Sequence, residues 1–551
     1  MPVSVQRVRV IRTLLLALVA CLACRLAWLH LVAGPGLAAL ALNQHTLVYS
    51  LGTGRGHILD RHLASLTDQT SQLTAVAFPP LVKDGVTAAR RLAPVLGLTQ
   101  EALRARLRGE TAVVLKAGLS QQAVAAVLRL GLDGVTVVPE EVRYGPKAAA
   151  PHLVGHLTAA GPGQWRGASG LERSFEAALT GRAAPAVAVV LDGRRQPLGT
   201  DYRLLTRPGA APGNLVTTLD VRVQRVAEEA LRASGIRKGA VVVVEAATGE
   251  LLAMASAPGF AQGDVLSHLN QADGPLVNRG LRGFPPGSLF KVAVAAAALD
   301  AGKVNITDTF FCPGYATVGD RVIACREHGI ANVSQLLVHS CNTAAVQLAA
   351  LAGKANVLAC LRDYGFGRPV DLGFAFPYLD LSQQAGALPE GRGMTAGDLA
   401  NLAIGQGSVL VTPLQVAQFM LAVANDGLHQ PLQLVREVRG ARGAVVWRPP
   451  IRPNSRWFAA SVGRRLRAAL TAATVEGTGW RAAGTVSAAG KTGTAETGKQ
   501  GTTHAWFAGY APSNRPQLVV VVLAEEGGIG GQVAAPLFRR VVEQTLALLN
   551  G

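Results

Sequence analysis

Lysine is scarce in this chain. Only nine of its 53 basic residues are Lys, so Arg outnumbers Lys about five to one. Acidic residues are also few, 35 in all, which leaves a net charge of +18. The sequence has no internal repeat and no low-complexity tract, and its hydrophobic content of 49% excludes a disordered protein. A length of 551 residues suits two to four domains with a large core.

The first 59 residues contain no acidic residue, since the first in the chain is Asp60. An apolar segment at 13–34 follows Arg7, Arg9 and Arg12. A bilayer core requires roughly 20 apolar residues, and basic residues on the short side keep that side in the cytoplasm. The sequence therefore predicts a cytoplasmic tail at 1–12, a single transmembrane anchor at 13–34 and an extracytoplasmic remainder at the cell membrane.

Two features of this segment leave an alternative open. Arg25 lies inside the span, where an arginine costs about 2.5 to 3.5 kcal/mol on insertion scales, so the boundaries could shift. A cleaved signal peptide with its apolar core at 13–24 is the alternative, and LVAC at 18–21 resembles a lipoprotein cleavage site. For an exported chain the positive charge excludes nucleic acid as a partner. It fits anionic lipid headgroups, acidic wall polymers or a solvated surface.

Cysteine is also rare, with six in the chain. Four are expected to be ordinary apolar or buried residues: Cys21, Cys24, Cys341 and Cys360. Cys312 and Cys325 lie close together in a loop-rich stretch, and in an exported chain they form either a disulfide or two free thiols. His328 lies nearby, but with this cysteine pair it does not supply the four ligands that a zinc site needs, so no metal is predicted.

The sequence pattern indicates two folded regions after the anchor. Residues 50–210 combine amphipathic helical segments with short strands and predict a small mixed α/β domain. A Pro- and Gly-rich linker follows at 207–214. Residues 215–551 begin with a helix at 220–234 and a hairpin and end with two strands and a helix at 534–550. They predict one α+β unit, an antiparallel sheet covered by helices.

One buried helix carries an unusual pair of residues. FPPGSLFKVAVAAAALDAG at 284–302 predicts an apolar helix that begins near Ser288, with Lys291 on the same face one turn later. Burial lowers the pKa of a lysine toward neutrality, so that its amine can accept a serine proton, and a helix N-terminus offers N–H groups to an oxyanion. Alone, S-x-x-K is a common pattern, and the pair is better explained by a plain N-cap serine and a snorkelling lysine.

Two further stretches strengthen the catalytic interpretation. In HSCN, Ser340 and Asn342 precede a second Ala-rich helix, and this motif taken by itself would indicate capping residues. AAGKTGTAETG at 488–498, taken by itself, would indicate a polar turn. In order, S-x-x-K, S-x-N and K-T-G are the three signatures of penicillin-interacting serine enzymes. Arg cannot be deprotonated, and both Lys291 and Lys491 are Lys in an Arg-dominated chain, which favours chemistry over surface charge.

With these motifs, nearly the whole chain resembles the class B penicillin-binding proteins, membrane-anchored transpeptidases that cross-link peptidoglycan. The similarity extends to RGHILDR at 55–61, ASGLERSFEAALTG at 168–181, ATGELLAMASAP at 247–258, AIGQGSVLVTPLQ at 403–415 and HAWFAGYAP at 504–512. Family members usually carry Gly two positions after the Asp-Arg pair, where this chain has His62 and Leu63. The SCN motif and the loop with Cys312 and Cys325 look most like the septal and spore-cortex branch.

The resemblance implies a role for each motif residue. Ser288 would attack the terminal D-Ala-D-Ala bond after passing its proton to Lys291, and the backbone N–H groups of Ser288 and Thr494 would hold the oxyanion. The resemblance also assigns catalytic roles to Ser340, Asn342 and Lys491, and substrate-binding roles to Thr492, Gly493 and Thr494. A stem-peptide amine would resolve the acyl-enzyme, β-lactams would inhibit it covalently, and no cofactor would be needed.

The resemblance also implies a partner and leaves other functions to be weighed. The domain at 50–210 would act as a pedestal that docks a polytopic membrane glycan polymerase, with Glu172 either part of the family pattern or a surface carboxylate. A serine β-lactamase and a penicillin sensor share the catalytic groups, although the former needs neither anchor nor pedestal and the latter normally has signalling segments. A non-enzymatic scaffold is the third alternative, disfavoured because all three motifs are retained.

Overall fold

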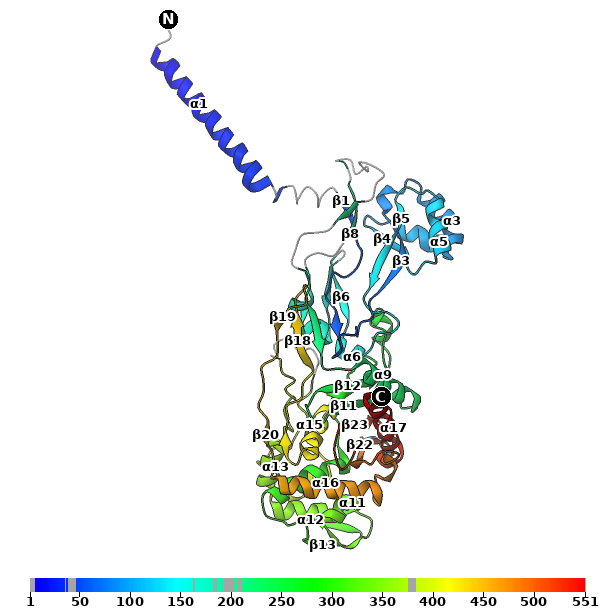
Figure 1. The fold of residues 1–551 in the computed structure, drawn as a ribbon, viewed down its shortest axis with the longest axis vertical. Helices are drawn as coiled ribbons and strands as arrows, with labels where there is room; N and C mark the ends of the chain where they lie inside the picture. The colour runs from blue at the N-terminus through cyan, green and yellow to red at the C-terminus, as the bar shows by residue number, and fades with distance from the viewer. Residues whose placement is uncertain are drawn as a thin grey trace. The chain divides into compact units, whose positions relative to one another are not determined.

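The computed structural model describes residues 5–34, 36–37, 46–161, 164–181, 186–190, 192, 203–205, 211–374 and 383–550 (Figure 1). It divides into two compact units. The first comprises residues 1–53, 70–142 and 183–209, and the second comprises 54–69, 143–182 and 210–551. RGHILDR at 55–61 thus belongs to the unit that carries the three motifs. The domain boundaries at 50–210 and 215–551 and the linker, of which only 211–214 is described, remain predictions.

The N-terminal segment is helical throughout its described apolar part. Helix α1 spans Val5–Trp28 and continues as a π-helix at Leu29–Ala33. The stretch Arg7–Ala33 has the length and composition of a membrane span, with a mean hydropathy of 2.1 in its most apolar window. The helix therefore begins earlier than the expected anchor at residue 13 and includes the arginines assigned to the tail. Arg25 places its guanidinium 4.5 Å from the centre of the Trp28 ring.

The first unit contains a small α/β layer, as the sequence predicts. Its central sheet has the order β4-β3-β5, with strands Thr70–Ala77 (β3), Val113–Lys116 (β4) and Val135–Val142 (β5). Its helices, each with a side-chain N-cap, are Gly85–Leu96 (α3), Gln100–Arg106 (α4) and Gln121–Arg129 (α5). A second sheet has the order β1-β8-β9, with strands Thr46–Ser50, Ala186–Val190 and Arg203–Leu205.

The second unit is built on a five-stranded antiparallel sheet in the order β12-β11-β23-β22-β21. Its strands are Gly239–Glu245 (β11), Leu251–Ala257 (β12), Ala489–Glu496 (β21), Thr503–Ala511 (β22) and Leu518–Ala524 (β23). Segments from the two ends of the unit thus meet in one sheet, because β11 pairs with β23. The fold class predicted from the sequence is confirmed.

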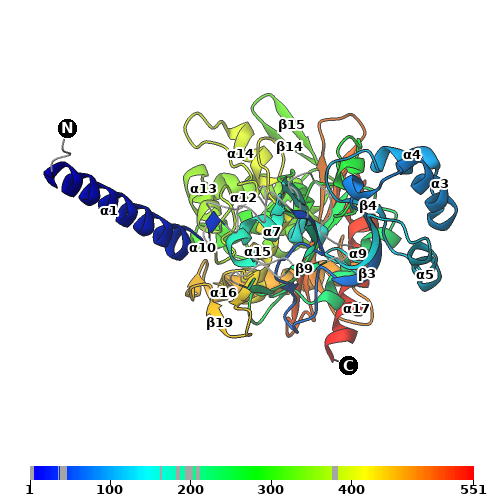
Figure 2. The ribbon, with the colours of Figure 1, turned by 90° about the horizontal axis from the view of Figure 1, so that it is seen from above.

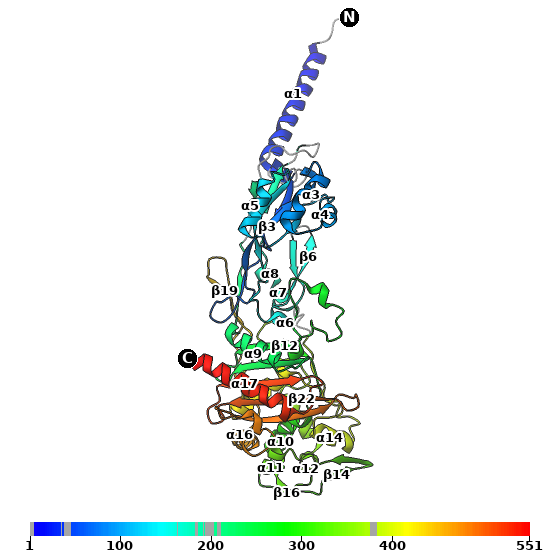
Figure 3. The same cartoon turned by 90° about the vertical axis from the view of Figure 1, so that its right-hand side faces the viewer.

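Helices cover both faces of this sheet. Val241 and Val243 face a core built with helices α9 (Val221–Ala233) and α17 (Gly530–Asn550). Val242 and Val244 face the larger core, built with α10 (Lys291–Asp300), α12 (Asn342–Ala352) and α15 (Pro413–Ala424). In Figure 3, α10 and α12 lie on the far side of the sheet from α9. Because both faces of β11 and β23 are buried, these two strands consist of continuous apolar runs instead of alternating ones.

The remaining elements extend this unit. In Figure 2, α12 lies beside α13 and α14. Two hairpin-like pairs, β13–β16 and β14–β15, follow α10 in the chain. The helices are α6 (Pro151–Val154), α7 (Gly170–Ser174), α8 (Glu176–Leu179), α11 (Val333–His339), α13 (Lys354–Asp363), α14 (Ala396–Ala403) and α16 (Ala460–Val475). The strands are β6 (Leu157–Gly161), β7 (Gln164–Gly167), β13 (Thr309–Cys312), β14 (Tyr315–Val318), β15 (Arg321–Ala324), β16 (Gly329–Asn332), β17 (Leu428–His429) and β20 (Ser455–Arg456). The 3₁₀-helices are η2 (Pro79–Leu81, in the first unit), η3 (Val265–His268), η4 (Arg279–Leu281), η5 (Gly287–Phe290) and η7 (Trp480–Ala482).

RGHILDR enters a second sheet of this unit, in the order β19-β18-β10-β2. Strand β2 (Ile58–Leu59) runs parallel to β10 (Asn214–Thr217), which is antiparallel to β18 (Val435–Arg439), and β19 is Val445–Trp447. After β2, Leu63 takes a positive φ of 66° in the turn, at the position where the resemblance expects Gly. The turn therefore keeps a left-handed backbone despite the departure in sequence.

A buried ion cluster lies beside this sheet. Glu172 is fully buried, and its carboxylate accepts from Arg55 at 3.0 Å and from Arg143. The Tyr144 hydroxyl donates to the same carboxylate at 3.1 Å, and Arg55 also pairs with Glu176 at 2.8 Å. The interpretation of Glu172 as a surface carboxylate is therefore wrong, because two arginines distant in sequence enclose it.

Candidate active site

Ser288 lies in the short helix η5, directly ahead of α10. Gly287 precedes it with a φ of 55°, and its N–H donates to the Gly405 carbonyl at 2.9 Å. A Cβ at Gly287 would lie 2.4 Å from the Thr494 carbonyl oxygen, so only glycine lets the serine turn pack against β21. This packing places the Ser288 turn next to the strand that carries the K-T-G motif.

Lys291 begins α10 and is fully buried. Its ammonium donates to the Ser340 carbonyl and to Asn342 Oδ1, both at 2.6 Å, and to Ser340 Oγ at 3.3 Å. Burial lowers the pKa of Lys291 to about 8. The lysine thus bridges the first two motifs, and an appreciable part of it is neutral near physiological pH.

The second motif adopts a strained turn between α11 and α12. Ser340 takes a φ of 60°, a left-handed conformation that costs a non-glycine residue on the order of 1 kcal/mol. Cys341 is the N-cap of α12, and its Sγ accepts from the Ala344 N–H at 3.3 Å. The simple capping interpretation of Ser340 and Asn342 is therefore wrong, since their side chains meet Lys291 instead.

The third motif is a strand, not a polar turn. Lys491 lies in β21 opposite Ala508 of β22 and is fully buried. Burial, together with the nearby charge of Lys291, holds the pKa of Lys491 well below its ordinary value. A Cβ at Gly493 would lie 2.6 Å from the Pro286 carbonyl oxygen, so this glycine lets β21 pack against the Ser288 turn. Its contact with substrate stays a prediction.

One cleft of about 900 Å³ joins the three motifs. Among the residues that line it are Ser288, Ser340, Asn342, Thr492 and Thr494. Lys291 and Lys491 lie behind this lining, where they contact Ser340 and Thr492 respectively. The sequence motifs therefore converge on one open groove, as the catalytic interpretation requires.

The cleft also contains residues that the sequence did not reveal. Thr478 exchanges a hydrogen bond with Thr492 through their hydroxyls at 2.9 Å, and Trp480 and Arg481 line the same cleft. All three follow α16, and Thr478 lies 14 residues ahead of Thr492 in the chain. No motif marks them, and their place at the cleft depends on the packing of α16 on β21 and of η7, which carries Trp480 and Arg481, on α17.

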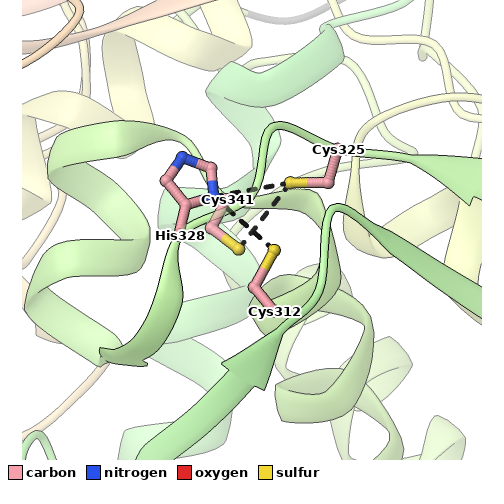
Figure 4. Close-up of side chains that lie close together, drawn as sticks. All are labelled: Cys312, Cys325, His328 and Cys341. Carbon is pink, nitrogen blue, oxygen red and sulfur yellow. Dashed lines mark hydrogen bonds between the residues drawn. The ribbon is translucent and has the colours of Figure 1, made fainter.

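The cysteines near the second motif form a cluster. All six cysteines of the chain are free, so the structure has the second of the two alternatives for Cys312 and Cys325. Cys341, expected to be an ordinary buried residue, lies with this pair and His328, and their ligand atoms are all within 4.8 Å of one another (Figure 4). The sequence by itself shows too few ligands, because Cys341 lies at the start of α12, apart from the segment that carries Cys312, Cys325 and His328.

Comparisons with known proteins agree with this geometry. Residues 239–543 match the penicillin binding protein transpeptidase domain and residues 51–211 match the penicillin-binding protein dimerisation domain. Peptidoglycan D,D-transpeptidase PbpA of Mycolicibacterium smegmatis is 32% identical over 69% of this chain and 79% of its own length. Stage V sporulation protein D of Bacillus subtilis is 28% identical, over 96% of this chain and 83% of its own length.

A solved structure is similar over the whole chain. It comes from work on the structural coordination of polymerization and crosslinking by a peptidoglycan synthase complex, with a TM-score of 0.69, 28% identity and 98% coverage of both chains. Fold and cleft together define a serine-type penicillin-binding transpeptidase. The chain belongs to the class B penicillin-binding proteins, the peptidoglycan D,D-transpeptidases. Peptidoglycan D,D-transpeptidase MrdA of Acinetobacter baumannii is also 28% identical to this chain, so the septal and spore-cortex branch stays a prediction.

Proposed function

We propose that Ser288 is the nucleophile with which this transpeptidase cross-links peptidoglycan stem peptides. Ser288 Oγ forms a bond to the carbonyl carbon of the penultimate D-Ala as its proton passes to Lys291 Nζ. The peptide C–N bond then breaks and D-Ala leaves with a proton. An amine from a neighbouring stem peptide attacks the ester, the ester C–O bond breaks as the cross-link forms, and a proton from the amine passes to Ser288 Oγ. A β-lactam carbonyl takes the place of the substrate in the first step.

The contacts of Lys291 are the observation that carries this proposal. A buried lysine that donates to both Ser340 and Asn342 is held at one position, and its lowered pKa suits it to accept a proton near neutral pH. Ser340 Oγ, 3.3 Å from Lys291 Nζ, relays that proton to the leaving D-Ala. Asn342 orients the lysine and the substrate amide.

The β21 side of the cleft supplies charge and anion recognition. Lys491 lies fully buried behind Thr492, and its proposed role is to keep the groove electropositive when its amine is protonated. Thr492 and Thr494 line the cleft and receive the terminal carboxylate of the substrate. The backbone N–H groups of Ser288 and Thr494 stabilise the oxyanion that develops during attack. Gly493 contributes to this site because it lets β21 pack closely against the Ser288 turn.

A labelling experiment tests the assignment of Ser288 and separates a transpeptidase or sensor from a β-lactamase and from a scaffold. The full-length chain in detergent is incubated with a fluorescent penicillin, and the bound label is followed in time and located by peptide mass spectrometry. We expect a label that persists for many minutes and maps to Ser288. Rapid release would indicate a β-lactamase, and absence of any label would indicate a scaffold. A persistent label at another residue would contradict the nucleophile.

The acylation rate is expected to depend on pH through Lys291. Its lowered pKa of about 8 means that the amine is largely charged at pH 6 and largely neutral at pH 9. Because only the neutral amine accepts the serine proton, the acylation rate should rise with pH and level off above about pH 8. Stopped-flow labelling across this range measures it, with buffer hydrolysis of the penicillin as the control. A rate that falls or stays flat would exclude a neutral Lys291 as the base.

We further propose the topology and a partner. The apolar helix Arg7–Ala33 anchors the chain in the cell membrane by a single pass, with both units outside the cytoplasm. Residues 50–210 act as a pedestal, and a polytopic glycan polymerase is the partner. The similarity to a chain from a peptidoglycan synthase complex supports that pairing. Protease digestion of intact spheroplasts tests the topology, because it should remove both units from outside.

A further inference from the structure

Four side chains with metal-ligating atoms converge beside the second motif. Cys312 is the last residue of β13, Cys325 and His328 lie between β15 and β16, and Cys341 caps α12. Cys312 and Cys341 are fully buried, and the other two are half-buried. In Figure 4 the three sulfur atoms and Nδ1 of His328 point toward one centre. Three cysteines and one histidine form a common donor set of structural zinc sites.

The separations within this cluster match a tetrahedral zinc site. Zinc bonds of about 2.3 Å to sulfur and about 2.0–2.1 Å to nitrogen imply ligand separations of about 3.8 Å for S···S and about 3.6 Å for S···N. The Sγ atoms of Cys325 and Cys341 are 3.8 Å apart. Nδ1 of His328 lies 3.6 Å from Cys312 Sγ and 3.7 Å from Cys325 Sγ. A disulfide would require about 2.05 Å between two sulfurs.

Two backbone N–H groups suit thiolate ligands at Cys325 and Cys341, whereas the Cys312 thiol donates to the Arg326 carbonyl at 3.3 Å and would lose that hydrogen bond on binding a metal. The N–H of Asn342 donates to Cys325 Sγ at 3.2 Å, and the N–H of Ala344 donates to Cys341 Sγ at 3.3 Å. Such outer hydrogen bonds orient metal-bound thiolates and offset their charge. We propose that Cys312, Cys325, His328 and Cys341 bind one structural zinc ion.

The site holds the second catalytic motif in place. Cys341 lies between Ser340 and Asn342, and Asn342 is tied to the neighbouring loop by its N–H to Cys325 and by its Nδ2 to the Ala324 carbonyl at 2.8 Å. Zinc would bond that loop and β13 directly to Cys341. It thereby fixes the strained turn whose side chains contact Lys291, and the metal positions the cleft without touching substrate.

Metal content and spectroscopy test this site on the full-length chain. The chain is purified in detergent without chelator, and its zinc is measured by inductively coupled plasma mass spectrometry. We expect about one zinc ion per chain. Replacement by Co²⁺ should produce the strong near-ultraviolet thiolate charge-transfer bands and intense visible bands of a tetrahedral sulfur-ligated cobalt. The wild-type chain suffices for both readouts, so a misfolded variant cannot obscure the result.

Variants locate the metal. Cys312→Ser and His328→Ala should lower the retained zinc several-fold, while Cys360→Ser, a free cysteine outside the cluster, should retain it. Removal of zinc should lower the melting temperature and slow acylation by a fluorescent penicillin, and both should recover when zinc is returned. Three results would each overturn the proposal: a chain that neither holds nor takes up zinc, a cobalt spectrum without thiolate bands, or a disulfide between Cys312 and Cys325 in the purified chain.

Discussion

Lys291→Arg is expected to slow acylation of Ser288 by penicillin about 10²- to 10⁴-fold, the range lost when a positioned general base is removed. Arginine keeps the positive charge, but its guanidinium is not deprotonated near neutral pH and cannot accept the serine proton. The variant therefore separates proton transfer from simple charge at this position. Stopped-flow labelling with a fluorescent penicillin measures the effect.

Two further variants calibrate this experiment. Ser288→Ala defines the background without a nucleophile. Lys303→Arg makes the same exchange on an exposed lysine just beyond α10 and should leave the rate unchanged. If Lys291→Arg melts like the wild-type chain and reacts within a few-fold of its rate, another group is the base.

Glu172→Gln is expected to lower the free energy of unfolding of the second unit by about 3–5 kcal/mol, the cost of breaking a buried ion pair. Arg55 and Arg143 are each 4% exposed, so loss of the carboxylate charge leaves two guanidinium groups buried with too little compensation. Among the residues that the structure describes, Arg55 then retains only Glu176 as a charged partner. Thermal and denaturant unfolding of the full-length chain measure the loss.

The matched control lies at the surface of the same unit. Arg237 and Asp273 approach to 3.8 Å with 75% and 42% of their side chains exposed. Arg237→Gln should therefore change stability by less than about 1 kcal/mol. Equal effects of the two substitutions would show that the Glu172 cluster is no more than a surface ion pair.

Much of the fold could be predicted from the sequence, because the patterns that indicate its helices and strands are local. The apolar runs of β11 and β23 and the amphipathic pattern of α9 and α17 predicted a covered sheet, which the structure confirms. Helix α1 begins before residue 13, where the predicted anchor starts, because its arginines are good helix formers although they are not apolar. A helix can thus extend beyond its hydrophobic part.

The sequence alone was enough to predict which residues would carry the chemistry, because S-x-x-K, S-x-N and K-T-G require particular side chains at fixed short spacings. Only the tertiary structure decided their surroundings. It revealed that Gly493 packs on the serine turn, that Glu172 is enclosed by two arginines, and that Cys341 joins Cys312, Cys325 and His328. Such contacts join residues from separate elements, and no local spacing encodes which distant surfaces will pack together.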